Sequence, residues 1–226
     1  MCASIEILKK RGKFPVVIVS VIPESSRLTM DILQQLNSLK NVIPEIRYDL
    51  IKNAKMNDRI HILDELNGSF SNMITTFRET NIDKAAIFYS QALNNKENII
   101  DVDYSLIHKM DLKLPPDRTL VSFHINERTP VLDIIDGIFK DGFRAVKVAI
   151  RTESENAFFG LCRDISNSKR ENIIFSLVPM GKNSSTQRLI SSLTVSDFTY
   201  TKFEGETGEG QLKYDSMLKI IDLLYE

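Results

Sequence analysis

Eight short runs of apolar, often β-branched residues alternate with longer segments of helical periodicity, and this alternation restricts the fold more than any other feature. Several runs are apolar at nearly every position, as is typical of parallel strands covered on both faces. The expected strands are Val16–Ile22, Val42–Tyr48, Met73–Phe77, Ile99–Val102, Thr119–Phe123, Ala145–Ile150, Ile173–Val178 and Phe198–Phe203.

Apolar residues between these runs recur at the spacing of amphipathic helices. Examples are Leu28–Leu39, Ile60–Leu66, Val131–Ile138 and Leu212–Leu224. The 226 residues give about 28 residues for each strand–helix unit, which fits a strand, a helix and two short loops. No Gly/Ser-rich linker divides the chain.

Eight uninterrupted units favour a compact (β/α)8 TIM barrel, an α/β fold, as one domain over residues 1–226, with residues 1–13 as an N-terminal lead-in segment. A doubly wound open sheet is the alternative. Against it, the residues after the first run, Ile22–Ser26, contain neither of the glycine-rich phosphate motifs typical of such sheets.

Composition excludes several classes of partner. The chain has 29 Lys+Arg against 30 Asp+Glu, so no excess positive charge favours nucleic acid. Its longest apolar run, Val16–Ile22, is far shorter than the ~20 residues of a membrane helix. The two cysteines, Cys2 and Cys162, and three histidines form neither a disulfide framework nor a metal motif. We expect a cytoplasmic protein with no nucleic-acid or membrane partner.

Polar residues at strand ends are candidate site residues, because chemistry in such barrels collects at the carboxyl ends of the strands. The polar or flexible groups with this placement are Glu45, Arg47, Arg78, His124, Lys147, Met180, Arg188 and the glycine-rich segment Gly205–Gln211.

Each candidate also has a purely structural interpretation. A lone histidine such as His124 is often structural, a strand lysine such as Lys147 extends its ammonium to water or an ion pair, and Glu45 with Arg47 forms an interior ion pair. The glycine segment is then a simple turn. Gathered at one barrel mouth, however, these groups provide carboxylate-binding arginines, a base and an amine. Burial and like charge from Arg144 and Arg151 are two reasons for Lys147 to have a lowered pKa.

Five motifs resemble those of the type I 3-dehydroquinate dehydratases, in the same order from about Val16 to the C-terminus. Ser122–Pro130 resembles the family's S-x-H-x-F-x-x-T-P signature, and Val146–Ala149 resembles the strand of its Schiff-base lysine. The other three are Met180 to Arg188, which resembles M-G-x-x-G-x-x-S-R, Thr207–Gln211, which resembles S-A-P-G-Q, and Glu45–Asp49, which resembles E-x-R-x-D. Departures from the motifs fall at Asn126, Ser184, Gln187, Gly208 and Glu209.

The resemblance implies a lyase that dehydrates 3-dehydroquinate to 3-dehydroshikimate, in the shikimate pathway of aromatic amino acid biosynthesis, without cofactor or metal. Lys147 would form an imine with the substrate ketone, and His124 would act as general acid and base. Arg188 would bind the substrate carboxylate. The remaining substrate-binding residues would be Ser20, Glu45, Arg47, Arg78, Met180, Thr207 and Gln211. A homodimer is also expected from the resemblance.

One expected partner is missing from its usual place. The family carries a histidine-orienting glutamate four residues after the arginine of the third strand, and this position is Ile82 here. Glu79 and Asp83 are the nearby carboxylates, and we favour Glu79 as the substitute.

Two other functions are open alternatives. One is a different Schiff-base barrel enzyme of the class I aldolase kind, against which the signature around His124 argues. The other is an inactive barrel that serves as a binding module, against which the joint presence of His124, Lys147 and Arg188 argues.

Overall fold

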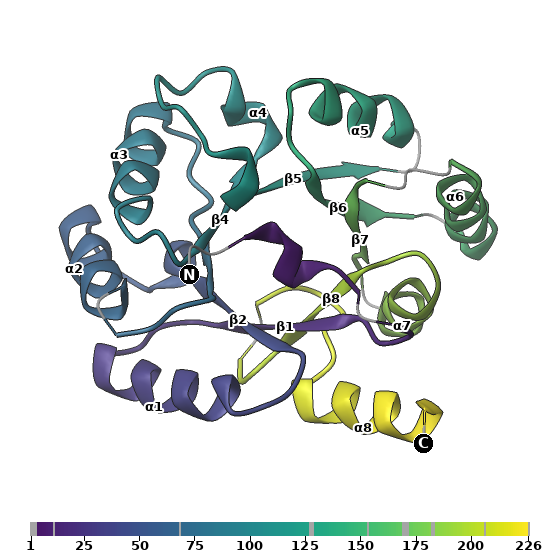
Figure 1. Ribbon diagram of the computed structural model, residues 1–226, viewed down its shortest axis with the longest axis horizontal. Helices are drawn as coiled ribbons and strands as arrows, with labels where there is room; N and C mark the ends of the chain where they lie inside the picture. Colours follow the sequence, from purple (N-terminus) through teal and green to yellow (C-terminus); the bar gives the residue numbers. More distant parts are fainter. Residues whose placement is uncertain are drawn as a thin grey trace.

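Eight parallel strands surrounded by helices form the fold (Figure 1). The computed structural model describes residues 4–10, 12–67, 69–126, 129–152, 154–168, 172–181, 184–205 and 207–225. The strands are β1 (Val16–Val21), β2 (Val42–Arg47), β3 (Ile74–Thr76), β4 (Ile99–Asp103), β5 (Thr119–Asn126), β6 (Ala145–Arg151), β7 (Ile174–Pro179) and β8 (Phe198–Lys202). The α-helices are α1 (Ser26–Asn37), α2 (Met56–Asn67), α3 (Ile82–Ala92), α4 (Tyr104–Ile107), α5 (Val131–Lys140), α6 (Glu155–Asn167), α7 (Ser184–Thr194) and α8 (Tyr214–Tyr225). Three short 3-10 helices complete the elements: η1 (Ile5–Leu8), η2 (Tyr48–Leu50) and η3 (Pro116–Arg118).

The order of the strands confirms a single-domain (β/α)8 barrel. Neighbouring strands follow one another in sequence, and β1 pairs in parallel with both β2 and β8. The open doubly wound alternative is therefore wrong, because it would not bring the first and last strands together. All eight expected strands are present. The largest difference is in β5, which continues to Asn126 because it pairs with β6 as far as Arg151.

Side chains complete the barrel between β7 and β8. The backbone N–H of Phe175 donates to the Asp197 carboxylate at 2.9 Å, and the N–H of Leu177 donates to the Ser196 hydroxyl at 3.0 Å. The Ser176 hydroxyl donates to the carbonyl of Phe198 at 2.7 Å. Polar side chains thus satisfy backbone groups that cannot be left unpaired in the interior.

The barrel interior is built in layers, because alternate residues of each strand point inward. The lowest layer is apolar, and η1 covers it from the N-terminal side with the buried side chains of Ile5 and Leu8. Within the expected lead-in segment, η1 therefore closes the base of the barrel. The strand residues of this layer are Ile18, Ile43, Ile74, Ile99, Leu120, Ala145, Ile174 and Phe198.

Two residues further along each strand, the interior becomes polar. This second layer is buried, and it lies directly beneath the carboxyl ends of the strands. Its members are Ser20, Glu45, Thr76, Asp101, Ser122, Lys147, Ser176 and Tyr200. The predicted site residues Ser20, Glu45 and Lys147 therefore share one level of the barrel with Asp101. Among the helices that the structure describes, none is long and apolar enough to cross a bilayer.

Asp197 provides a test of the junction between β7 and β8. Its carboxylate also accepts a hydrogen bond from the backbone of Lys10 at 3.2 Å, which ties the N-terminal segment to this junction. Asp197→Ala should lower the free energy of unfolding by about 1–3 kcal/mol, because the buried N–H of Phe175 loses its acceptor. Urea denaturation measures the difference. Asp164→Ala, at an exposed position of α6, is the control and should change it by less than about 0.5 kcal/mol. Equal values for both variants would contradict a structural role of Asp197.

Candidate active site

Lys147 of β6 lies in the polar second layer of the barrel and is 8% exposed. Its ammonium forms an ion pair with the fully buried Asp101 of β4. A second carboxylate, Glu45 of β2, lies 3.7 Å from Nζ, and the Tyr200 ring centroid lies 4.2 Å away. The amine is therefore held inside the barrel between two anions and an aromatic face.

Burial lowers the pKa of Lys147 below its ordinary value of 10.5. The carboxylates of Asp101 and Glu45 oppose this shift, and the nearby cation of Arg78 adds to it. The expected contribution of burial agrees with this direction, whereas the expected contribution of Arg144 and Arg151 is wrong because both side chains point elsewhere. The first lies over Phe139, 4.1 Å from the ring centroid, and the second pairs with Glu209 at 2.9 Å. A lowered pKa increases the neutral, nucleophilic fraction of the amine.

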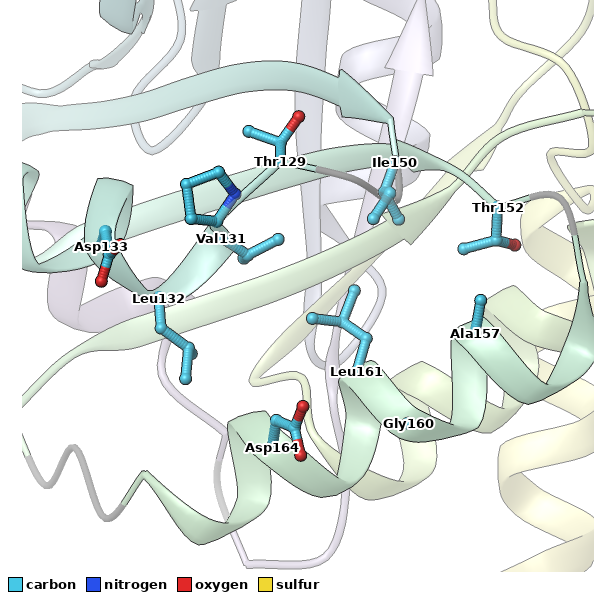
Figure 2. A pocket seen from close by; sticks show the side chains of 11 residues that line it. Thr129, Val131, Leu132, Asp133, Ile150, Thr152, Ala157, Gly160, Leu161 and Asp164 are labelled. Carbon is cyan, nitrogen blue, oxygen red and sulfur yellow. The ribbon is translucent and has the colours of Figure 1, made fainter.

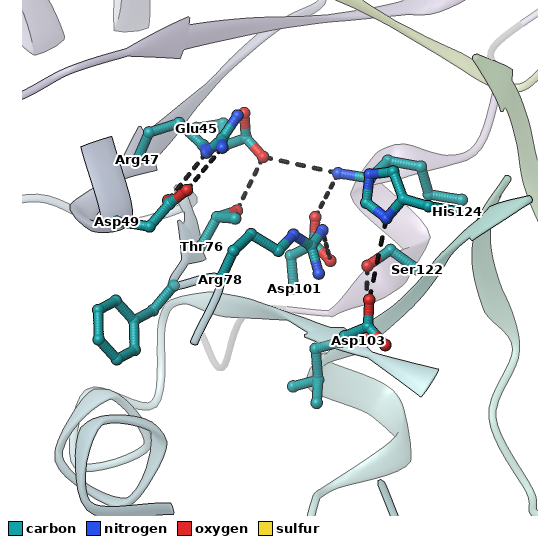
Figure 3. A network of polar contacts seen from close by, with 12 residues as sticks. Glu45, Arg47, Asp49, Thr76, Arg78, Asp101, Asp103, Ser122 and His124 are labelled. Atoms are coloured by element: carbon teal, nitrogen blue, oxygen red, sulfur yellow. Dashed lines mark hydrogen bonds and ion pairs between the residues drawn. The ribbon is translucent and has the colours of Figure 1, made fainter. Parts of the chain in front are cut away.

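Hydroxyl groups fix the carboxylate of Glu45. Ser20 of β1 donates to one of its oxygens at 2.6 Å. Thr76 of β3 donates to the other oxygen at 2.8 Å (Figure 3). Glu45 is 1% exposed, and Ser20 is fully buried. These hydrogen bonds hold both carboxylate oxygens in place next to Lys147.

Arg47 does not form the interior ion pair with Glu45 that the sequence allowed. Its guanidinium makes a two-pronged contact with Asp49, at 3.0 and 2.6 Å. The remaining Nη1 donates to the carbonyl of Thr207 at 3.1 Å. Arg47 thus connects the end of β2 to the segment that follows β8.

Arg78 follows β3 and donates to the second oxygen of Asp101 at 2.8 Å (Figure 3). Although burial alone would raise it, the pKa of Asp101 is held well below its usual range by Arg78 and Lys147. The Nη1 of Arg78 is buried without a hydrogen-bond partner in the described part of the chain. One donor of this arginine is therefore available to a bound molecule.

His124, near the end of β5, is half exposed at the mouth of the barrel. Its Nδ1 lies 3.8 Å from a carboxylate oxygen of Asp103, the last residue of β4. The carboxylate of Glu79, which the sequence favoured as its partner, instead accepts hydrogen bonds from the backbone of Thr80 and Asn81. Asp83 lies exposed in the first turn of α3.

Arg188, in the first half of α7, is a buried cation at 5% exposure. Its Nη2 donates to the backbone carbonyl of Glu209 at 3.0 Å. Its Nε and Nη1 are buried and have no partner among the residues that the structure describes. Burial lowers the pKa of Arg188 to about 10. A desolvated guanidinium with unused donors is suited to binding an anion.

The segment Thr207–Gln211 contacts three elements at the mouth, which are β2 through Arg47, β6 through Arg151 and α7 through Ser185. The Thr207 hydroxyl donates to the Gln211 side chain, and Ser185 of α7 donates to the carbonyl of Gly210 at 3.1 Å. Met180 packs against the barrel interior from the end of β7. Lys182 and Glu206, which belong to the motifs discussed above, lie outside the described residues.

A cavity of about 490 Å³ lies elsewhere, between α5 and α6 (Figure 2). Its lining includes Val131, Leu132 and Leu161, with Asp133 and Asp164 as its titratable groups. Among the described residues that line it, none is a candidate nucleophile or a cation. The barrel mouth, where the cations and carboxylates converge, is therefore the candidate active site.

A model of the type I 3-dehydroquinase family matches residues 17–226. The chain belongs to this family. It is 30% identical over 216 residues to the 3-dehydroquinate dehydratase of Thermoplasma volcanium, covering 94% of this chain and 90% of the relative. The corresponding protein of Thermoplasma acidophilum is 25% identical over 224 residues, covering 95% of each.

Solved structures show the same fold. Type I 3-dehydroquinate dehydratase from Clostridium difficile superposes with a TM-score of 0.75 at 17% identity, covering 98% of this chain and 96% of that one. The Geobacillus kaustophilus enzyme gives 0.74 at 16% identity, covering 94% and 92%. The family expected from the five motifs is confirmed, and the chain is an enzyme of the 3-dehydroquinase class.

Sequence reasoning missed Asp101 and Asp103. They occupy alternate positions of Ile99–Asp103, and the remaining residues of this strand are all apolar. Two carboxylates at strand spacing inside an apolar run point to the same face. That spacing was a usable signal for an interior anionic pair.

The ion pair with Asp101 allows the pKa of Lys147 to be tested by substitution. Asp101→Asn should lower this pKa further, because the carboxylate that stabilises the ammonium is lost. Competitive acylation followed by peptide mass analysis measures the titration of each lysine. The exposed Asp83→Asn serves as control and should leave Lys147 unchanged. A Lys147 that titrates together with the surface lysines in the unmodified protein would contradict the assignment.

Proposed function

We propose that this chain dehydrates 3-dehydroquinate to 3-dehydroshikimate through a Schiff base on Lys147. The observation that carries the proposal is the amine of Lys147, buried beside Asp101 and Glu45 at the level where the strands open to the mouth. Membership of the 3-dehydroquinase family supports the substrate.

The neutral amine of Lys147 attacks the C3 ketone, and loss of water gives an iminium. The iminium withdraws electrons from C2, so His124 can remove the C2 proton and leave an enamine. The enamine expels the C1 hydroxyl, which leaves as water after His124 returns the proton. Hydrolysis of the resulting iminium releases the product and regenerates the amine.

The other site residues bind and orient the substrate. Arg188 binds the carboxylate through a donor that the protein leaves unused, and Arg78 offers its free Nη1 to a ring hydroxyl. Met180 packs against the ring, while Thr207 and Gln211 close over it. Glu45 and Arg47 address the ring hydroxyls. Ser20 is fully buried and donates to Glu45, so it acts through that carboxylate.

The direct experiment is to mix the protein with 3-dehydroquinate and follow ultraviolet absorbance, because the product has a conjugated enone and the substrate has none. Activity should survive dialysis against a chelator, since the proposed mechanism needs no metal or cofactor. A folded sample that captures a ketone as an imine without forming the enone would favour the aldolase alternative. Neither activity would favour the binding module. The homodimer stays a prediction, which sedimentation would test.

Covalency at Lys147 is the first prediction from this mechanism. Borohydride added with substrate should reduce the imine, attach a stable mass to Lys147 and abolish activity. Lys147→Ala should lose both the adduct and turnover. Lys147→Arg should not restore them, because a guanidinium keeps its proton at neutral pH.

Lys202 provides the matched control for that experiment. It ends β8 and is only partly buried. Lys202→Ala should retain the adduct, which peptide mapping would locate. An adduct on Lys202 in the unmodified protein would overturn the role of Lys147.

Arg188 gives a second prediction. Arg188→Ala should reduce kcat/KM by an amount equivalent to about 2–5 kcal/mol, because the substrate carboxylate loses a buried charge-assisted partner. Most of the loss should appear in KM. An analogue without the carboxylate should bind both forms with similar affinity. Arg163→Ala, at an exposed position of α6, should change neither value. Equal losses for substrate and analogue would assign Arg188 a structural role.

A further inference from the structure

Asp103 and His124 meet across neighbouring strands at the barrel mouth. In the parallel pairing of β4 with β5, Asp103 lies opposite Ser122, so His124 projects from the next inward-facing position of β5. This brings Nδ1 of the imidazole to 3.8 Å from Oδ2 of Asp103 (Figure 3). Among the described acidic residues, no other has an ion pair with this histidine.

We propose that Asp103 is the positioning residue of His124, accepting a hydrogen bond from Nδ1–H and leaving Nε2 free to exchange a proton with substrate. The proposal rests on the function proposed above for its catalytic consequence. It assigns the orienting carboxylate to the end of β4 instead of the segment between β3 and α3.

The other oxygen of Asp103 is held independently of the histidine. Oδ1 accepts hydrogen bonds from the backbone N–H and the hydroxyl of Ser105, at 2.9 and 2.7 Å. Asp103 is thereby the N-cap of α4, which fixes its side chain and leaves Oδ2 for the imidazole. The separation of 3.8 Å is longer than a hydrogen bond, so the proposal requires the half-exposed imidazole to rotate towards Asp103. Catalytic contacts are commonly long in the absence of substrate.

The surrounding charges keep Asp103 ionised. Burial would raise its pKa, but the neighbouring imidazole of His124, the hydrogen bonds from Ser105 and the cation of Arg78 lower it to about 2. The charged groups on the elements around His124 are Arg78 after β3, Asp101 and Asp103 on β4, and Lys147 and Arg151 on β6. Arg78 and Lys147 are already paired with Asp101, and Arg151 is paired with Glu209. Glu127 and Arg128 lie outside the described residues.

The segment after β3 offers no competing carboxylate in this structure. Glu79 is engaged by its own turn, and Asp83 is exposed on α3. The side chain at Ile82 is apolar and partly exposed. A carboxylate on β4 reaches the histidine from a regular strand, so its position depends on strand register and not on a loop.

Two substitutions separate geometry from charge. Asp103→Ser retains a side-chain cap for α4 but is too short to reach the imidazole. Asp103→Asn retains both the cap and an acceptor for Nδ1–H but removes the charge. Nitrogen-15 NMR of the ligand-free protein reports which nitrogen of His124 carries the proton, with His124→Gln identifying its signals among the three histidines.

In the unmodified protein we expect the Nδ1–H tautomer at His124. Asp103→Asn should preserve it, whereas Asp103→Ser should shift the population towards Nε2–H. The pair His108–Asp141, joined at 2.9 Å, is a matched control outside the barrel mouth. Asp141→Ser should alter the His108 signals, leave those of His124 unchanged and leave turnover unchanged.

Kinetics supply the second readout. Asp103→Ser should lower kcat by up to about 10²-fold through misplacement of the base. Its KM should change little, and borohydride should still capture the substrate on Lys147. Asp103→Asn should lose less activity. A general loss of folding would instead remove capture and turnover together, which circular dichroism would detect.

The outcomes distinguish this inference from the proposed function. A His124 tautomer that is Nε2–H in the unmodified protein, or unchanged by Asp103→Ser, overturns the role of Asp103 even if the enzyme is active. An unmodified protein that forms no enone, but whose tautomer depends on Asp103, overturns the proposed function and supports the pairing.

Discussion

The ion pair between Lys147 and Asp101 is the interaction on which the site depends. Asp101 also binds Arg78, and Glu45 lies within 3.7 Å of the ammonium, so two cations and two anions share the barrel interior. Removing one member of a buried group of charges leaves the others uncompensated, at a cost of several kcal/mol. The four residues therefore constrain one another. The ammonium of Lys147 shares the carboxylate of Asp101 with Arg78.

The layers of the barrel explain how such a cluster is tolerated. Beneath it, an apolar layer closed by η1 excludes water, and the outward-facing residues of the same strands pack under the helices. Within the polar layer, hydroxyl side chains complete the hydrogen bonds of the charged groups, as Ser20 and Thr76 do for Glu45. Each strand thus contributes to stability at its start and to chemistry at its end.

The sequence predicted the barrel well because each strand is a continuous apolar run and each unit has similar length. Family motifs also mark Lys147, His124 and Arg188 individually, and their roles stay predictions. The partners of these residues were harder to predict. Asp101 and Asp103 meet their partners through the register of neighbouring strands, which periodicity does not specify. Glu79 was close to Arg78 in sequence, but its carboxylate satisfies its own turn before α3.

The arginines at the mouth differ in how many of their N–H donors have acceptors among the described residues. Arg47 is neutralised by Asp49 and donates its remaining Nη1 to Thr207. Arg78 is neutralised by Asp101. Arg188 has only a backbone carbonyl as its acceptor, and no carboxylate among the described residues pairs with it. Burial without a counter-ion is unfavourable, so a bound carboxylate gains most at Arg188. In the proposed mechanism, a substrate held there by its carboxylate is oriented relative to Lys147 before the imine forms.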